Sequence, residues 1–289
     1  MMSAQASKQD RASDHDLPEF RDPPLAEVVL GIQFDPLVGM AAAHMDAIWE
    51  LFRQTFPRTE DRQPLLATFE RFDPPPEPGA VQWNLDLFAR PSLPRCWFIN
   101  DSGDELLQLQ QDRFLHNWRK VKSQPEYPRY AHLRQSFEEE VEALRRFAAH
   151  NGIGVVKPNQ CEITYINHIV AGAHWREHWQ AARVFRPLAD ADAGPFSARP
   201  EHVRWETAFV MREDDGEPRR RLHVSVVSGF IQEGGAPMFA MTLTARGAPI
   251  CDELTDIMGF LDLGHRWIVR SFADLTTEAM HAAWGRKTR

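Results

Sequence analysis

Alternating apolar and polar residues mark the first strand of the chain. Over 26–34 every even position is apolar, whereas the odd positions include Glu27, Gly31 and Gln33. Such a period of two is typical of a half-buried β-strand. Similar patterns predict further strands over 65–71, 81–88, 96–100, 106–109, 162–170, 203–211, 222–227 and 239–245, with a hairpin turn at Asp214-Asp215-Gly216.

Apolar residues at helical spacing predict three helices, over about 40–56, over about 128–150 and from Asp252 onward. Pro57 ends the first helix and Asn151-Gly152 ends the second. The second helix has an apolar stripe that we expect to be buried: Tyr130, Leu133, Phe137, Val141, Leu144 and Phe147. The third has a similar stripe: Leu254, Ile257, Met258, Leu261, Ile268 and Phe272.

The order of these elements predicts an α+β fold with two halves, 23–152 and 153–289. The first half reads β-α-β-β-β-β-α and the second reads β-(irregular)-β-β-β-α. Hairpin spacing is too short for parallel crossovers, so we expect mainly antiparallel sheets with helices on one face. The halves should pack as one unit, and an internal duplication is a hypothesis from element order alone. Residues 1–22 are polar and small, which predicts a disordered leader.

The composition narrows the functional classes. Hydrophobic residues make up 43% of the chain and the net charge is -8 at pH 7, which argues against sequence-blind nucleic-acid binding. The chain contains no run of 18 or more apolar residues, so we expect no membrane span. Cys96, Cys161 and Cys251 are scattered and form no CxxC pair, which favours the reducing cytoplasm.

A chemically mixed segment follows the strand over 106–109. It combines amide, aromatic and cationic side chains that could hold a nucleotide, an acidic peptide or another anion. We therefore predict a ligand-binding segment made of Asn117, Trp118, Arg119, Lys120, Lys122 and Tyr127. The alternative is structural: Trp118 lies in the core, and Arg119 pairs with Glu27 or with a carboxylate in 138–140.

The sheet face opposite the helices should carry polar side chains, and it is either a second binding surface or a solvated face. In the first half these are Gln82, Asn84 and Gln108, and in the second they are Arg204, Glu206, His223, Ser225 and Thr242.

Three other groups of residues could carry chemistry. His174 and His178, with Glu177 between them, would share one face of a helix and could bind a metal. His223 and Ser225 lie two apart on one strand, too far for a nucleophile and its base. Asp262 and His265 could form a local pair. No phosphate-binding loop or calcium loop is present. We therefore expect no cofactor and no bound metal, and the sequence leaves catalysis open.

Several of these residues belong to a pattern that resembles a sporadically distributed bacterial family of uncharacterised proteins. The pattern comprises Pro23-Pro24-Leu25-Ala26-Glu27-Val28-Val29, Gly31, Phe34, Leu107-Gln108-Leu109-Gln110, Asp112-Arg113-Phe114, Asn117-Trp118-Arg119, Tyr127-Pro128, Tyr165-Ile166-Asn167, Asp262, His265, Phe272 and Trp284-Gly285. The resemblance implies a cytoplasmic protein of patchy occurrence, a habit shared by mobile, defence-linked and toxin-antitoxin genes. It implies no particular activity.

These observations favour a non-enzymatic binding or regulatory protein that holds a protein partner or a small anionic ligand. One alternative is a metal-dependent or hydrolytic enzyme that uses His174, Glu177 and His178. Another is local nucleic-acid binding through Arg119, Lys120 and Lys122, which would require affinity that falls steeply with salt.

Overall fold

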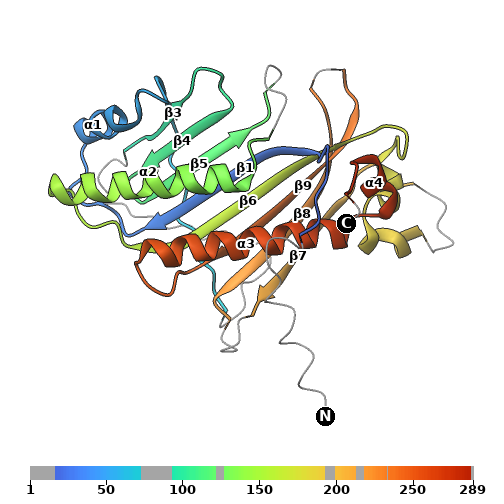
Figure 1. The fold of residues 1–289 in the computed structure, drawn as a ribbon. Helices are drawn as coiled ribbons and strands as arrows, with labels where there is room; N and C mark the ends of the chain where they lie inside the picture. Colours follow the sequence, from blue (N-terminus) through green and yellow to red (C-terminus); the bar gives the residue numbers. More distant parts are fainter. Residues whose placement is uncertain are drawn as a thin grey trace, which may run out of the picture.

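The described part of the chain forms one nine-stranded antiparallel sheet in the order β2-β3-β4-β5-β1-β6-β9-β8-β7 (Figure 1). The computed structural model describes residues 17–72, 93–121, 127–192, 199–212, 218–232 and 234–287. The strands of the first half are β1 (Leu25–Phe34), β2 (Arg58–Arg62), β3 (Arg95–Ile99), β4 (Glu105–Gln110) and β5 (Arg113–Arg119). Those of the second half are β6 (Pro158–Val170), β7 (Arg204–Met211), β8 (Arg220–Phe230) and β9 (Pro237–Gly247).

The two halves have the same plan and meet at the centre of the sheet. In each half the first strand pairs with the last, β1 with β5 and β6 with β9. The two first strands, β1 and β6, then pair with each other and make one continuous sheet. The predicted α+β class with an antiparallel sheet is therefore confirmed.

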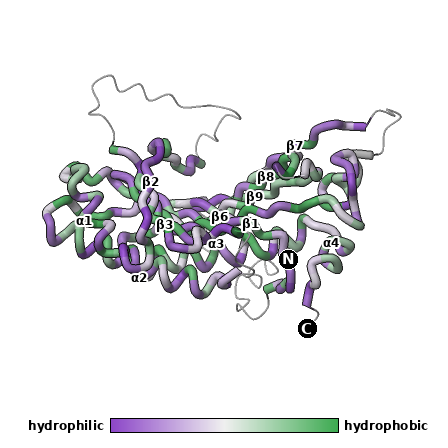
Figure 2. Tube along the Cα trace, turned by 90° about the horizontal axis from the view of Figure 1, so that it is seen from above, coloured by the Kyte–Doolittle hydropathy of each residue, from purple (hydrophilic) through white to green (hydrophobic). Residues whose placement is uncertain are grey.

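Helices cover one face of this sheet (Figure 2). They are α1 (Ala42–Phe52), α2 (Tyr130–His150), α3 (Leu254–Leu275) and α4 (Glu278–Ala283), with the 3-10 helices η3 (His178–Arg183) and η4 (Arg186–Asp192) in the irregular part of the second half. Helix α2 packs on β1 and β5, and α3 packs on β6 and β9. The predicted apolar stripes are buried, except that Phe147 and Leu254 are only partly covered. No helix in the described ranges is long and apolar enough to cross a membrane.

The other face of the sheet holds an extended segment, residues 63–72, through its side chains. The side-chain oxygens of Gln110, Gln33 and Gln160 accept backbone N–H groups of this segment, from Leu65 at 2.9 Å, Thr68 at 2.8 Å and residue 70 at 3.3 Å. The prediction of a strand over 65–71 was wrong, because sheet side chains and not a neighbouring backbone bind this segment. The predicted strand over 81–88 and the turn at 214–216 lie outside the described residues.

Glu70 anchors this segment to the second half of the sheet. Its carboxylate accepts a bond from Arg221, lies 2.6 Å from Nε2 of His223 and 3.6 Å from the guanidinium of Arg246. Burial would raise the pKa of Glu70, but the hydrogen bond with His223 and the nearby cations lower it. Part of the predicted polar face is therefore occupied by the chain itself.

Candidate ligand-binding site

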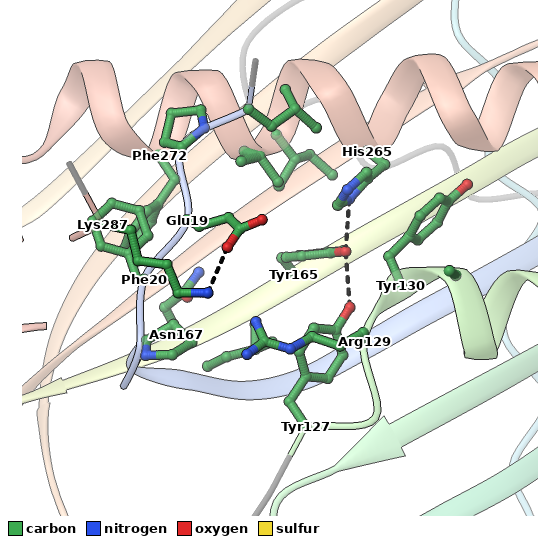
Figure 3. A pocket seen from close by; sticks show the side chains of 17 residues that line it. Glu19, Phe20, Tyr127, Arg129, Tyr130, Tyr165, Asn167, His265, Phe272 and Lys287 are labelled. Carbon is green, nitrogen blue, oxygen red and sulfur yellow. Dashed lines mark hydrogen bonds and ion pairs between the residues drawn. The ribbon is translucent and has the colours of Figure 1, made fainter. Parts of the chain in front are cut away.

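A cavity of about 470 Å³ lies on the helical side of the sheet (Figure 3). Five segments that are distant in sequence surround it: residues 17–25, the turn before α2 with the first residues of that helix (127–131), Tyr165 and Asn167 on β6, α3 from His265 to Phe272, and Lys287. Most of its wall is apolar or aromatic, and a few polar groups point inward. This size and lining are typical of a small-molecule site.

A line of three hydrogen-bonding side chains crosses the cavity wall. The hydroxyl groups of Tyr127 and Tyr165 lie 3.1 Å apart, and the Tyr165 hydroxyl lies 2.8 Å from Nδ1 of His265 (Figure 3). The three residues come from the turn before α2, from β6 and from α3. Each hydroxyl still has capacity for a further hydrogen bond with a molecule in the cavity.

Close approach of α3 to the sheet sets the His265–Tyr165 distance. A Cβ atom at Gly264 would lie 2.5 Å from Cγ2 of Ile163 on β6 and 3.0 Å from Cβ of Ala245 on β9. Only glycine allows the helix backbone to come this near. The residue that follows Gly264 is His265, so this contact brings the imidazole within hydrogen-bond distance of β6.

Helix α2 fixes the other side of His265. The ring of Tyr130 stacks on the imidazole with 4.0 Å between ring centroids and 8° between planes. The Tyr130 hydroxyl donates to Asp262 at 2.7 Å, and Nε of Arg134 donates to the same carboxylate at 2.9 Å. Asp262 and His265, predicted as a local pair, therefore both belong to this site, with Asp262 joined to α2 and His265 joined to β6.

The three phenols at the cavity are neutral near pH 7. Burial raises the pKa of Tyr127 and Tyr165, and burial together with the charge of Asp262 raises that of Tyr130. A neutral phenol donates and accepts hydrogen bonds but does not abstract protons. These hydroxyl groups can therefore bind a polar group of a ligand through hydrogen bonds.

The two ends of the described chain close one side of the cavity. Backbone bonds join Arg21 to Gly285 and Asp22 to Trp284, at 3.1 and 3.0 Å. Phe20 packs edge-on against Phe272 and Trp284, with ring centroids 5.6 and 6.1 Å apart. Near this contact Lys287 Nζ lies 2.7 Å from the carboxylate of Glu19 (Figure 3).

Arg129 lies at the mouth of the cavity in an unusual backbone conformation. Its φ of 75° and ψ of 150° make it the one non-glycine residue with positive φ among the described residues. This conformation costs about 1–3 kcal/mol in a side-chain-bearing residue. The side chain is exposed and lines the cavity beside Tyr127 (Figure 3).

The predicted ligand-binding segment is divided between the core and this cavity. Asn117 and Trp118 lie on β5, an inner strand of the sheet, and are only 4% and 2% exposed. Asn117 donates to Glu27 at 2.6 Å, and the Trp118 ring packs against Tyr127 with centroids 5.0 Å apart. Trp118 thus supports the cavity from behind, and Tyr127 is the predicted residue that lines it.

The cationic members of that segment lie elsewhere. Nε of Arg119 donates to the carbonyl of Gly103 at 2.7 Å, and its guanidinium lies 5.9 Å from the Trp97 ring centroid. Arg119 therefore contacts a backbone carbonyl and an indole ring. The structural alternative had instead predicted a pair with the carboxylate of Glu27 or of a residue in 138–140. Lys120 is exposed, and Lys122 lies outside the described residues.

The other candidate groups do not assemble into a site. His174 is exposed in a bend, whereas His178 begins η3 and is buried with Nε2 3.0 Å from the Gly229 carbonyl, so no single helix face carries both. Within the described ranges no group of three His, Cys, Asp or Glu side chains is arranged to hold a metal ion.

The polar face on the opposite side of the sheet is largely paired internally. His223 binds Glu70, and Arg204 pairs with Glu206 at 2.6 Å. Gln108 is buried and donates to Asn117 at 2.7 Å. Gln82 and Asn84 lie outside the described part of the chain.

Comparisons with known proteins add little to this description. No protein-family model matches the chain, and no curated protein matches it. Among solved structures, the di-domain ARO/CYC StfQ from the steffimycin biosynthetic pathway aligns over 86% of this chain and 98% of its own length. The identity is 10% and the TM-score is 0.18, so we draw no conclusion from this likeness. The resemblance to a bacterial family stays a prediction.

Proposed function

We propose that this protein binds a small organic molecule in the cavity between β6, α3 and the turn before α2. The observation that carries the proposal is the cavity of about 470 Å³ with the hydrogen-bonded line of Tyr127, Tyr165 and His265 along its wall. An apolar body would fill the space left by the aromatic and aliphatic side chains. The phenols would then fix its orientation through one or two hydrogen bonds.

The same features favour binding without catalysis. The phenols are neutral, and their hydrogen bonds and stacking contacts hold them in place. A protein of this kind would carry, sense or sequester its ligand, as a regulatory subunit does. A cytoplasmic location remains part of the proposal, supported by three cysteines that are all free. An association with defence or toxin-antitoxin genes rests on the family resemblance alone.

A fluorescence titration with the neutral dye N-phenyl-1-naphthylamine tests this function. Ala131 is exposed at the start of α2 and lines the cavity, so Ala131→Trp should fill the mouth without disturbing the core. Ala149 is exposed at the far end of the same helix, and Ala149→Trp is the matched control. We expect saturable binding to the wild type and to Ala149→Trp, and a loss of at least tenfold in affinity for Ala131→Trp. Equal binding by all three proteins would contradict the proposal.

A further inference from the structure

The side chains around the cavity carry one more positive than negative charge, and this excess indicates which class of ligand the cavity would bind. Arg129 and Lys287 are the cations in its lining, and Glu19 is the carboxylate. Glu19 and Lys287 pair at 2.7 Å and compensate each other. No carboxylate among the described residues pairs with Arg129. The mouth therefore keeps one positive charge in a protein whose net charge is -8.

Arg129 is held at the cavity by its neighbours in the chain. It lies between Tyr127 and Tyr130, and both of these side chains are fixed by hydrogen bonds, to Tyr165 and to Asp262. Its positive φ of 75° leads the chain from the turn into α2 while the side chain stays at the cavity mouth (Figure 3). A guanidinium offers a planar fork of donors that fits a carboxylate or a sulfonate.

The deeper part of the cavity favours a flat ring. Five of its lining side chains are phenylalanine or tyrosine: Phe20, Tyr127, Tyr130, Tyr165 and Phe272. Rings of this kind pack well against another ring through offset or edge-on contacts. A ligand that reaches these rings from the mouth would place its charged end beside Arg129.

We infer that the ligand is an aromatic acid, with its ring among Phe20, Tyr165 and Phe272 and its anionic group on Arg129. This inference rests on the proposed function and specifies the chemistry of the same site. It makes Arg129 a specificity-determining residue, which favours acids over neutral molecules with the same body.

Two dyes that share the same aromatic ring system but differ in charge distinguish the effect of the anionic group from that of the rings. 8-Anilinonaphthalene-1-sulfonate carries the anion, and N-phenyl-1-naphthylamine is its uncharged counterpart. Titration of the wild type should show tighter binding of the anionic dye. In Arg129→Gly, which also accepts the positive φ, we expect the affinity for the anionic dye to fall by about tenfold. The affinity for the neutral dye should change less than twofold.

Arg146→Ala is the control, because it removes one positive charge from an exposed site near the other end of α2, and we expect it to leave both affinities unchanged. An unchanged ratio of the two affinities in Arg129→Gly would overturn the assignment of an acid while leaving the cavity a binding site. Failure of both dyes to bind the wild type would instead refute the proposed function. Thermal melting of each variant confirms that the compared proteins are folded.

Discussion

At the scale of single residues, three of the side chains predicted to contact a ligand, Asn117, Trp118 and Arg119, are held by contacts within the protein. Arg119 illustrates this, because its guanidinium bonds the Gly103 carbonyl and lies over Trp97. Arg129 shows the converse: it was not among the predicted site residues, yet the fold places it at a cavity. Local chemistry alone does not distinguish a side chain that faces a neighbouring loop from one that faces a cavity.

Replacement of Arg119 by Lys should lower the stability of the folded protein without changing dye binding. Lysine keeps the charge but cannot reproduce the directed Nε bond to Gly103 and the position of the guanidinium over the Trp97 ring. We expect a loss of about 1 kcal/mol, measured as a shift of a few degrees in thermal melting. Arg146→Lys, at an exposed position on α2, should not shift the melting temperature. An unchanged melting temperature in Arg119→Lys would show that these contacts contribute nothing.

Because of His116, the free energy of unfolding should fall as the pH becomes alkaline. It is fully buried, with Nδ1 2.8 Å from Glu140 and Nε2 3.4 Å from Glu105. Burial would lower the pKa of His116, but the charge of Glu140 and the bond with Glu105 raise it to about 9. A raised pKa means that this stabilisation is complete below about pH 6.5 and is lost as the pH rises through about 9.

Chemical denaturation between pH 6 and pH 10 measures this effect. We expect the free energy of unfolding to fall by about 2–4 kcal/mol over that range in the wild type. His116→Gln should be less stable at pH 6 and nearly independent of pH across the same range. Equal slopes for the two proteins would contradict a protonated His116.

At the scale of elements, the close contact of α3 with β6 positions the site. Helix α3 contains two glycines that differ in their surroundings. A Cβ at Gly264 would meet Ile163 at 2.5 Å, whereas a Cβ at Gly259 would meet nothing within 4 Å. The two positions therefore separate the intrinsic effect of glycine in a helix from the effect of close packing.

Alanine at these two positions should have opposite effects. Gly259→Ala should stabilise the protein by about 1 kcal/mol, because alanine is the better helix former. Gly264→Ala should destabilise it by about 1–3 kcal/mol through overpacking, and should weaken dye binding by moving His265 away from Tyr165. Denaturant unfolding and the dye titration measure both quantities. Equal gains in stability at the two positions would show that α3 is free to shift.

The attachment of the segment 63–72 to the sheet should depend on Glu70. Loss of its negative charge in Glu70→Gln would leave Arg221 buried without a counter-charge, at a cost of about 3–5 kcal/mol. The amides of Leu65, Thr68 and residue 70 should then exchange faster with solvent in hydrogen-exchange measurements. Glu60→Gln, which alters an exposed pair with Arg62, should leave this exchange unchanged. Unchanged protection in Glu70→Gln would contradict the anchoring role.

Because the pKa of Glu70 is lowered, the stability of its contact with Arg221 and His223 should decrease in acid. Its stabilisation is present above the ordinary pKa of about 4.5 and is lost as the pH falls through the lower folded value. Faster exchange of the segment should therefore appear in the wild type only at strongly acid pH.

At the scale of the whole molecule, the sequence predicted the elements better than their assembly. Alternation located β1 and β6, and helical spacing located α2 and α3, because these periods follow directly from which residues are buried. These sequence patterns did not predict β2 and β5. In β2 every side chain is exposed, and β5 was read as a binding segment because it is rich in polar residues.

The cavity could not be predicted for a different reason. Its walls come from segments around 20, 127, 165 and 268, which only the pairing of β1 with β6 and the approach of α3 bring together. A signal was present, since Tyr127, Tyr165 and His265 all belong to the pattern behind the family resemblance. Nothing in the sequence indicated that they share one site.

A crystal structure of the protein soaked with 8-anilinonaphthalene-1-sulfonate tests the central claim, that this cavity is a ligand-binding site, most directly. We predict that the naphthalene ring lies among Phe20, Tyr165 and Phe272, with the sulfonate within hydrogen-bond distance of the Arg129 guanidinium. Dye bound to another surface, with the cavity empty at a concentration that saturates the titration, would contradict the account.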